Sequence, residues 1–373
     1  MESTNINAST FIPRSVYGDY IQSILTEAII NAPSFVQVER ITAAAVAIEP
    51  RSQQVGIYLE TGEWVQADRA VLALGNFPSQ LPKPLSILDP QDVRDAWSRE
   101  ALTQLDADAS VLLVGTGLTM VDMVVALYQQ GHRGKVHAIS RHGLRPQRHQ
   151  TVAPYETPLP LEQMPVTVRL LLRQVRQEIQ TAAAQGQDWR AVIDALRPVS
   201  QQLWQRLSLR EQKRFLRHVK AYWEVHRHRI APEIADLLDR LTQSGQLIYH
   251  AGRIQDCTPR HLTNPAIEVR IRQRGNPTET VLSVQRVINC TGSSCDYRQL
   301  NHPLIESLHK QHLIRFSPLG IGIETAENGA LIHAEGQASK QLYTLGTPRK
   351  GTLWETTAVP ELRVQAENLA QVL

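Results

Sequence analysis

Val111-Leu-Leu-Val114-Gly115-Thr-Gly117 is the stretch that decides the fold, because four apolar residues stop at a turn built on two glycines. Val111 to Val114 read as a short strand that is buried on both faces, and Gly115 permits the tight turn that leaves it. Gly117 has no Cβ, so a pyrophosphate can approach the backbone closely. The stretch therefore predicts a dinucleotide-binding turn.

An amphipathic helix is expected directly after this turn, over residues 118–128. Its predicted apolar face consists of Leu118, Val121, Val125 and Tyr128. The N-terminus of such a helix points free N–H groups at a bound phosphate. Met120 stands where the G-x-G-x-x-G pattern has its third glycine, so the identification depends on the order of strand, turn and helix.

A second short strand, Lys135 to Ile139, completes a βαβ unit and ends in Ser140-Arg141-His142. An NAD-specific site places Asp or Glu at this strand end, whereas a 2′-phosphate needs cations and hydroxyls. We therefore expect NADPH, with Arg141 as a ligand of the 2′-phosphate and Arg145 and Arg148 as reinforcements; the alternative is a solvated basic loop. The candidate NADPH ligands are Gly115, Thr116, Gly117, Leu118, Thr119, Ser140, Arg141 and His142.

The composition is that of an ordinary globular protein, with 373 residues of which 42% are hydrophobic and 20% charged. No apolar run is long enough to span a bilayer, and residues 1–10 are polar, without the core of a signal peptide. Three cysteines without a C-x-x-C pair argue against a disulfide framework. The net charge of +3 is too small to demand nucleic acid. We therefore expect a cytoplasmic protein of two or three domains that binds neither a membrane nor nucleic acid.

Hydrophobic periodicity divides the chain into strand-rich and helix-rich parts. A helix is expected within residues 11–30 and a closing helix over 354–370, and residues 166–244 read as an inserted helical subdomain. Strands are expected at 35–38, 45–48, 55–59, 64–66, 69–74, 247–250, 267–271, 281–284, 286–290 and 342–345. The predicted domains are 1–108, 109–292 with an insert at about 157–245, and 293–373.

Two strands that end in glycine, Ala73-Leu-Gly75 and Cys290-Thr-Gly292, resemble the connectors of flavoproteins with two dinucleotide-binding domains. Together with the Gly115 turn, Ser140–Pro146, Trp223–Arg229 and Leu353–Pro360, they make the chain resemble the FAD/NAD(P)-binding protein family, which is related to flavin-containing and N-hydroxylating monooxygenases. The resemblance covers nearly the whole chain from Phe11 onward. It implies an α/β fold with two Rossmann-like, three-layer domains of the FAD/NAD(P)-binding type, a helical insertion, and FAD beside NADPH.

In that family an N-terminal strand with its own glycine fingerprint opens the FAD domain. Here Phe11-Ile-Pro-Arg14 stands where that segment should already have ended, so we expect the first domain to be incomplete, and another chain could supply the missing strand. In related flavoproteins a closing helix such as the one expected over 354–370 begins beside the flavin ring. The alternative is that this helix packs into the core through Leu362, Ala366 and Leu369. The candidate residues at the domain crossovers and near FAD are Gly75, Asn76, Thr291, Gly292, Gly346, Thr347, Trp354 and Glu355.

The segment Lys213–Arg229 is basic with interleaved aromatics, which indicates a solvated helical face more than nucleic-acid contact. His218, His226 and His228 lack the accompanying ligands of a metal site, so no metal is expected. In flavin chemistry the cofactor carries the reaction, and no catalytic residue is assigned. The sequence predicts an NADPH-dependent flavoprotein oxidoreductase that acts on a small molecule with oxygen or another acceptor. The alternative is a non-catalytic NADPH-binding or assembly module that needs another chain to complete its FAD site.

Overall fold

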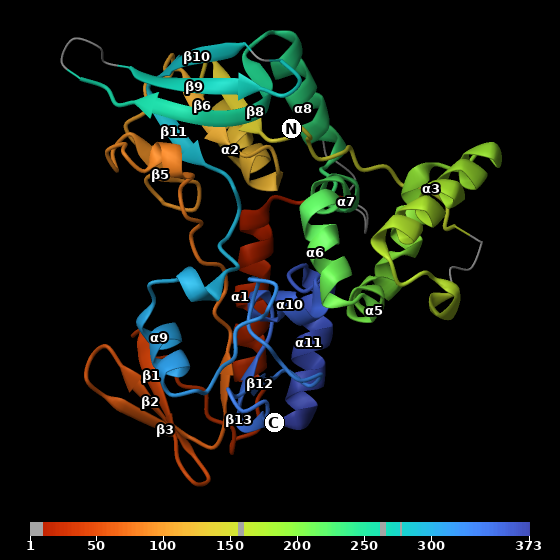
Figure 1. The fold of residues 1–373 in the computed structure, drawn as a ribbon. Helices are drawn as coiled ribbons and strands as arrows, with labels where there is room; N and C mark the ends of the chain where they lie inside the picture. The colour runs from red at the N-terminus through yellow and green to blue at the C-terminus, as the bar shows by residue number, and fades with distance from the viewer. Residues whose placement is uncertain (1–9, 156–159, 262–265, 277) are drawn as a thin grey trace.

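A computed structural model describes residues 10–155, 160–261, 266–276 and 278–373. Figure 1 shows an upper lobe around a seven-stranded sheet, a lower lobe with two three-stranded sheets, and a helical insertion beside them. Parallel strands and covering helices confirm the expected α/β fold of the FAD/NAD(P)-binding type. No helix in the described ranges is long and apolar enough to cross a membrane.

The upper lobe is built on a sheet with the strand order β10-β9-β8-β7-β6-β11-β5. Its central strands β6 (Val111–Val114), β7 (Val136–Ser140) and β11 (Arg286–Asn289) are parallel, as the apolar runs predict. β5 (Val93–Asp95) and β8 (Leu247–Thr258) extend this parallel arrangement, and β9 (Ile267–Gln273) and β10 (Glu279–Val284) add an antiparallel hairpin. The helices α2 (Leu118–Gln129) and α8 (Pro232–Gln243) pack on the sheet, so α8 belongs to the core of this lobe.

The apolar face of α2 differs in detail from the predicted one. Met120, Val121, Val124 and Leu127 are buried, whereas Tyr128 is 50% exposed. A third glycine at the Met120 position would let helix and strand pack closely. Here the fully buried methionine side chain fills that space, which explains why the turn tolerates this departure from the fingerprint.

The lower lobe contains the meander β1 (Ala45–Pro50), β2 (Val55–Leu59) and β3 (Trp64–Ala67), and a second sheet in the order β12-β13-β4. In this second sheet β4 (Ala70–Leu72) is parallel to β13 (Ala338–Thr344), and β12 (Ala330–Ile332) is antiparallel to β13. α9 (Pro303–Lys310) packs against the meander. The strand predicted at 35–38 is wrong, because this segment pairs with no strand in the described ranges and Phe35 is 85% exposed.

The helical insertion consists of α3 (Val168–Ala184), α4 (Trp189–Ala195), α5 (Ser200–Arg206), α6 (Leu209–His218) and α7 (Lys220–Arg227). Short 3₁₀ turns lie at Lys83–Leu85, Leu161–Gln163, Arg197–Val199, Tyr297–Gln299 and Thr347–Arg349. At the N-terminal side α1 (Arg14–Ile30) runs from the junction of the lobes along the lower lobe (Figure 1), and none of its residues is buried.

The closing helix begins later than expected, because α10 (Lys350–Leu353) ends in a turn at Trp354, whose φ is +63°. α11 (Val359–Val372) follows. Of the predicted core positions only Leu369 is buried; Leu362 is half-buried and Ala366 is exposed. Gln365 is buried instead, and its side-chain amide bonds with Thr356.

A pair of histidines on neighbouring strands makes the stability of the upper lobe depend on pH. His137 Nδ1 lies 3.0 Å from His250 Nε2, and burial, His250 and Lys135 lower the pKa of His137 to about 4. The unfolded chain binds this proton near pH 6.5, so the stability contributed by the neutral ring is present above that pH and is lost as the pH falls toward 4. We expect His137→Gln to remove about 1–2 kcal/mol of the acid-induced loss at pH 5.

Urea unfolding of the unaltered protein and of His137→Gln between pH 8 and pH 5 measures this difference in the free energy of unfolding. His309→Gln on the exposed surface of α9 is the control, because it leaves the pair in place. An unchanged dependence on pH in the His137→Gln protein would contradict the assignment.

Candidate nucleotide-binding site

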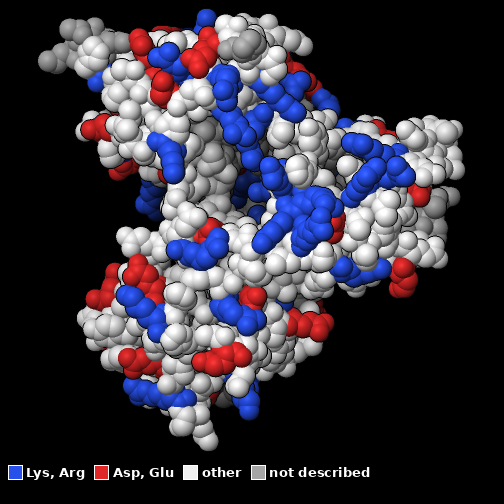
Figure 2. All heavy atoms as spheres, in the orientation of Figure 1, with Lys and Arg blue, Asp and Glu red and all other residues white. Residues whose placement is uncertain are grey.

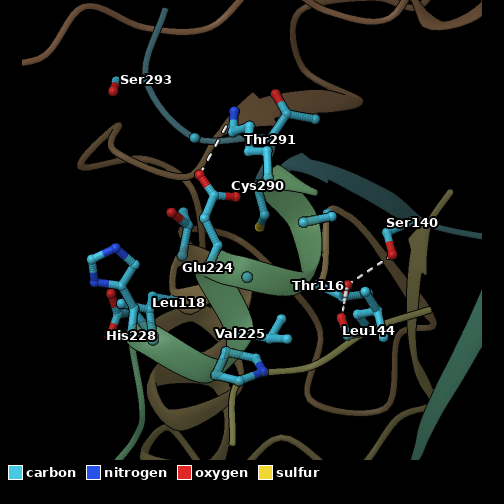
Figure 3. Close-up of a pocket in the computed structure, with 18 of the residues that line it drawn as sticks. Thr116, Leu118, Ser140, Leu144, Glu224, Val225, His228, Cys290, Thr291 and Ser293 are labelled. Carbon is cyan, nitrogen blue, oxygen red and sulfur yellow. Dashed lines mark hydrogen bonds and ion pairs between the residues drawn. The ribbon is translucent and has the colours of Figure 1, made fainter. Parts of the chain in front are cut away.

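A cavity of 1410 Å³ lies where the two lobes and the helical insertion meet. Figure 3 draws side chains that line it, among them Thr116 after β6, Glu224 on α7, His228 directly after α7, and Thr291 after β11. All the predicted NADPH ligands, Gly115 to Thr119 and Ser140 to His142, line this cavity. The fold therefore brings the two ends of the predicted βαβ unit into one space.

The turn after β6 has the geometry of a phosphate-binding loop. Gly115 has a φ of +119°, and a Cβ at this position would lie 2.4 Å from the carbonyl oxygen of Cys290. Gly117 caps α2, and a Cβ there would meet no atom within 4 Å, so the space beside it is open. None of the described side chains caps the N-terminus of α2, so its first N–H groups are available to an anion.

The end of β7 is held against this turn by hydroxyl groups. The Thr116 hydroxyl lies 2.8 Å from the Ser140 hydroxyl and also donates to the carbonyl of Leu144 (Figure 3). The Ser140 hydroxyl accepts a bond of 3.0 Å from the backbone N–H of Gly143. These contacts fix the loop that carries Arg141, whose side chain is exposed.

Two of the cations predicted at the phosphate site form ion pairs with carboxylates of the protein. Arg145 lies 3.4 Å from Asp239, and Arg148 pairs with Asp236, both on α8. Their charges are thus compensated within the protein. Neither residue is among those that line the cavity, so the described structure gives no support to the expectation that they reinforce Arg141. The sequence does not reveal that α8 places its carboxylates beside this loop.

The three glycine connectors meet on the lower side of the cavity. Asn76, which follows Gly75, accepts a hydrogen bond of 3.1 Å from the Thr347 hydroxyl. Thr291 donates to the side chain of Asn289 over 2.7 Å. Asn76, Thr291, Gly292 and Thr347 line the cavity, whereas Gly75, Gly346, Trp354 and Glu355 do not. Gly75, Gly292 and Gly346 have φ values of +65°, +91° and +76°, respectively.

Trp354 and Glu355 join the C-terminal segment to the helical insertion. The Trp354 ring packs at 5.2 Å between centroids on both Trp204 and Phe215. The buried Glu355 carboxylate accepts a bond of 2.7 Å from the Trp223 indole N–H. Packing between the helical insertion and the lower lobe therefore accounts for the positions of both residues.

Several cavity residues were missed by the sequence reasoning. Asp122 lies 2.9 Å from Arg14, and partial burial raises the pKa of its carboxyl group. Glu224, His228 and Lys350 line the cavity from outside the predicted nucleotide motifs. Burial lowers the pKa of His228, whose Nε2 lies 3.8 Å from Glu355. The Trp223–Arg229 motif of the resemblance was the signal that could have placed α7 beside the site.

The histidines of the basic segment do not gather with other ligands. Among the residues that the structure describes, no group of three or more His, Cys, Asp and Glu side chains is arranged to hold a metal ion. His226 Nδ1 instead lies 2.7 Å from the carbonyl oxygen of Tyr222 within the same helix.

The comparisons with known proteins agree with this geometry. Residues 2–77 match a family model described as FAD-NAD(P)-binding. The match agrees with the resemblance to that family expected from the sequence. No curated protein sequence matches the chain.

Similar solved structures are N-hydroxylating flavoprotein monooxygenases. The ornithine hydroxylase of Pseudomonas aeruginosa has a TM-score of 0.61 and 17% identity, with 97% of this chain and 76% of that chain covered. The ornithine N-hydroxylase of Kutzneria sp. 744, described with reduced FAD, NADP+ and L-ornithine, has a TM-score of 0.62 and 14% identity, with 98% and 77% covered.

A third similar structure is the FAD-bound cadaverine monooxygenase of Erwinia amylovora, with a TM-score of 0.60, 14% identity, and coverage of 98% and 74%. At such identities the likeness concerns the fold. The protein therefore has the fold of flavin-dependent N-hydroxylating monooxygenases.

Proposed function

We propose that this protein is an NADPH-dependent flavoprotein oxidoreductase of the monooxygenase type that acts on a small molecule. The observation that carries the proposal is the single cavity shared by the Gly115 turn, the β7 end and the residues Asn76, Thr291 and Thr347 at the connectors. The similar structures that are described with FAD and NADP+ support the same pair of cofactors. A cytoplasmic location and domain boundaries after residues 108 and 292 also remain proposals.

The residues fit NADPH at the upper side of the cavity. The N–H groups at the start of α2 and the open space at Gly117 would hold the pyrophosphate, and Arg141 would bind the 2′-phosphate. Asn76, Thr291 and Thr347 would contact FAD from the connectors. When bound, NADPH supplies a hydride, and FAD passes the electrons to oxygen or another acceptor.

Side chains from the C-terminal part of the helical insertion also line this cavity. Glu224 and His228 line the same cavity, and the Lys220 ammonium lies 3.7 Å from the Glu224 carboxylate. A carboxylate and an imidazole here can hold a polar or cationic group of a substrate. The similar structures act on ornithine and cadaverine, so a small primary amine is the first substrate class to test.

A visible spectrum of the purified protein, followed by anaerobic addition of NADPH, tests the proposal. We expect flavin absorbance that bleaches with NADPH and returns when air is admitted. Absence of flavin absorbance after incubation with FAD, together with no affinity for NADPH in calorimetry, would overturn it.

Arg141→Gln should reduce the preference for NADPH over NADH about tenfold or more, because a charge-assisted bond to phosphate contributes about 1.5–3 kcal/mol. Dissociation constants from fluorescence titrations with both nucleotides measure the effect. Arg145→Gln is the matched control, since Arg145 pairs with Asp239. Equal loss of both nucleotides in the Arg141→Gln protein would assign Arg141 to another role.

The second candidate is a nucleotide-binding module that holds FAD only together with another polypeptide. Two observations favour it: in the described residues β4 has β13 on one edge and no strand on the other, and α1 leaves side chains such as Ile30 (75% exposed) in solvent. Such a module would bind NADPH with micromolar affinity but contain no flavin. Stable flavin retention by this chain alone would exclude it.

A further inference from the structure

A second cavity, of 620 Å³, adjoins the first at the upper lobe. The two share Arg141, His142, Arg217, His218, Gly252 and Arg253, so they open into each other. Arg272 and Arg274 on the β9 side complete a set of five arginines. We call this set of five the arginine pocket. Figure 2 shows Lys and Arg side chains gathered where the upper lobe faces the helical insertion.

The arginine pocket contains charges that the protein itself does not compensate. None of its five guanidinium groups forms an ion pair with a carboxylate in the described ranges, and no Asp or Glu lines the cavity. Arg274 Nη1 instead lies 2.6 Å from His142 Nδ1. Partial burial and the neighbouring arginines lower the pKa of His142, which keeps that ring neutral and able to accept from Arg274.

A neighbouring arginine shows the contrast. Arg270 lies on β9, two residues before Arg272, and is 3.1 Å from Asp256 and 3.6 Å from Glu279. Arg270 is thus compensated by carboxylates, whereas Arg272 and Arg274 have no carboxylate partner among the described residues. Like charges held together without partners repel each other, and a bound anion relieves this repulsion.

The position of the pocket identifies the anion. A dinucleotide whose pyrophosphate lies at Gly117 directs its adenosine ribose toward the end of β7, where Arg141 stands between the two cavities. Guanidinium groups bind phosphate oxygens through paired N–H bonds. Arg217 reaches the pocket from α6, so one of the ligands comes from the helical insertion.

We propose that Arg217, Arg253 and Arg274 join Arg141 in binding the 2′-phosphate of the nucleotide, so that the helical insertion and the β8–β9 hairpin close on its adenosine end. This inference rests on the proposed use of NADPH, and it adds residues from two further elements to the one at β7. Arg217 thereby makes nucleotide selection depend on the placement of the insertion.

Calorimetry with 2′,5′-ADP and 5′-AMP tests the proposal without any flavin or turnover. The unaltered protein should bind 2′,5′-ADP at least tenfold more tightly than 5′-AMP. Arg217→Gln, Arg253→Gln and Arg274→Gln should each weaken 2′,5′-ADP about five- to twentyfold and change 5′-AMP less than twofold. Arg270→Gln is the matched control and should change neither. All four arginines are exposed, and an unchanged melting temperature verifies folding.

The outcomes separate this inference from the proposed function. A protein that takes up no flavin but shows the expected preference and its loss in the variants would favour the nucleotide-binding module over the oxidoreductase and support the proposed role of the arginines. Equal binding of 2′,5′-ADP and 5′-AMP, or variants that keep the full preference, would overturn the inference even for an active flavoprotein. Salt-dependent binding of RNA or DNA through the same arginines, without preference for 2′,5′-ADP, would also overturn it.

Discussion

Gly115→Ala is expected to destabilise the protein and to abolish measurable NADPH binding. A Cβ at this position would lie 2.4 Å from the Cys290 carbonyl oxygen and 2.8 Å from its carbonyl carbon, which are backbone atoms of a central strand end. The φ of +119° is also one that alanine rarely adopts. Together these effects cost on the order of 2–4 kcal/mol. Thermal unfolding should show a melting temperature lower by several degrees.

Gly115→Ala is expected to reduce both stability and NADPH binding, and Gly117→Ala separates these two effects. A Cβ at Gly117 meets nothing within 4 Å and its φ is −85°, so the fold should keep its melting temperature. The added methyl group would occupy the space beside the N-terminus of α2, and NADPH should bind at least tenfold more weakly. Normal NADPH affinity in the Gly117→Ala protein would show that the pyrophosphate lies elsewhere.

Glu355→Ala should loosen the attachment of the helical insertion to the lower lobe. The substitution leaves the Trp223 indole N–H without its acceptor and removes a negative charge near the buried Arg227. Arg227 keeps its ion pair with Glu361, so the main cost is the unsatisfied buried donor, about 1–3 kcal/mol. We expect a lower melting temperature and faster proteolysis within α3–α7.

Glu355 also has a predicted role beside FAD, and the same variant distinguishes the two roles. Glu355→Gln can still accept from Trp223, so it should be less destabilising than alanine. Glu367→Ala on the exposed side of α11 is the control. A Glu355→Ala protein with an unchanged melting temperature but no retained flavin would favour direct contact with the cofactor.

Much of the upper lobe could be predicted from the sequence because its signals are local. Four consecutive apolar residues indicate a strand buried on both faces, and a glycine after them permits the positive φ observed at Gly115. The polar end of β7 follows from the residue order alone. The rotated face of α2 was missed, because the helix period allows neighbouring stripes and only the packed sheet selects Met120 and Val124.

The sequence by itself determined the βαβ unit, its glycine turn and the cationic strand end at Arg141, because periodicity and backbone freedom are properties of adjacent residues. Only the tertiary structure decided which charges are available to a ligand. Arg145 and Arg148 pair with carboxylates of α8, whereas Arg217 and Arg274 come together from α6 and the end of β9 and have no carboxylate partner in the part of the chain that the structure describes. The physical reason is that ion pairs and cavities form between segments far apart in the chain, so they depend on how the elements pack.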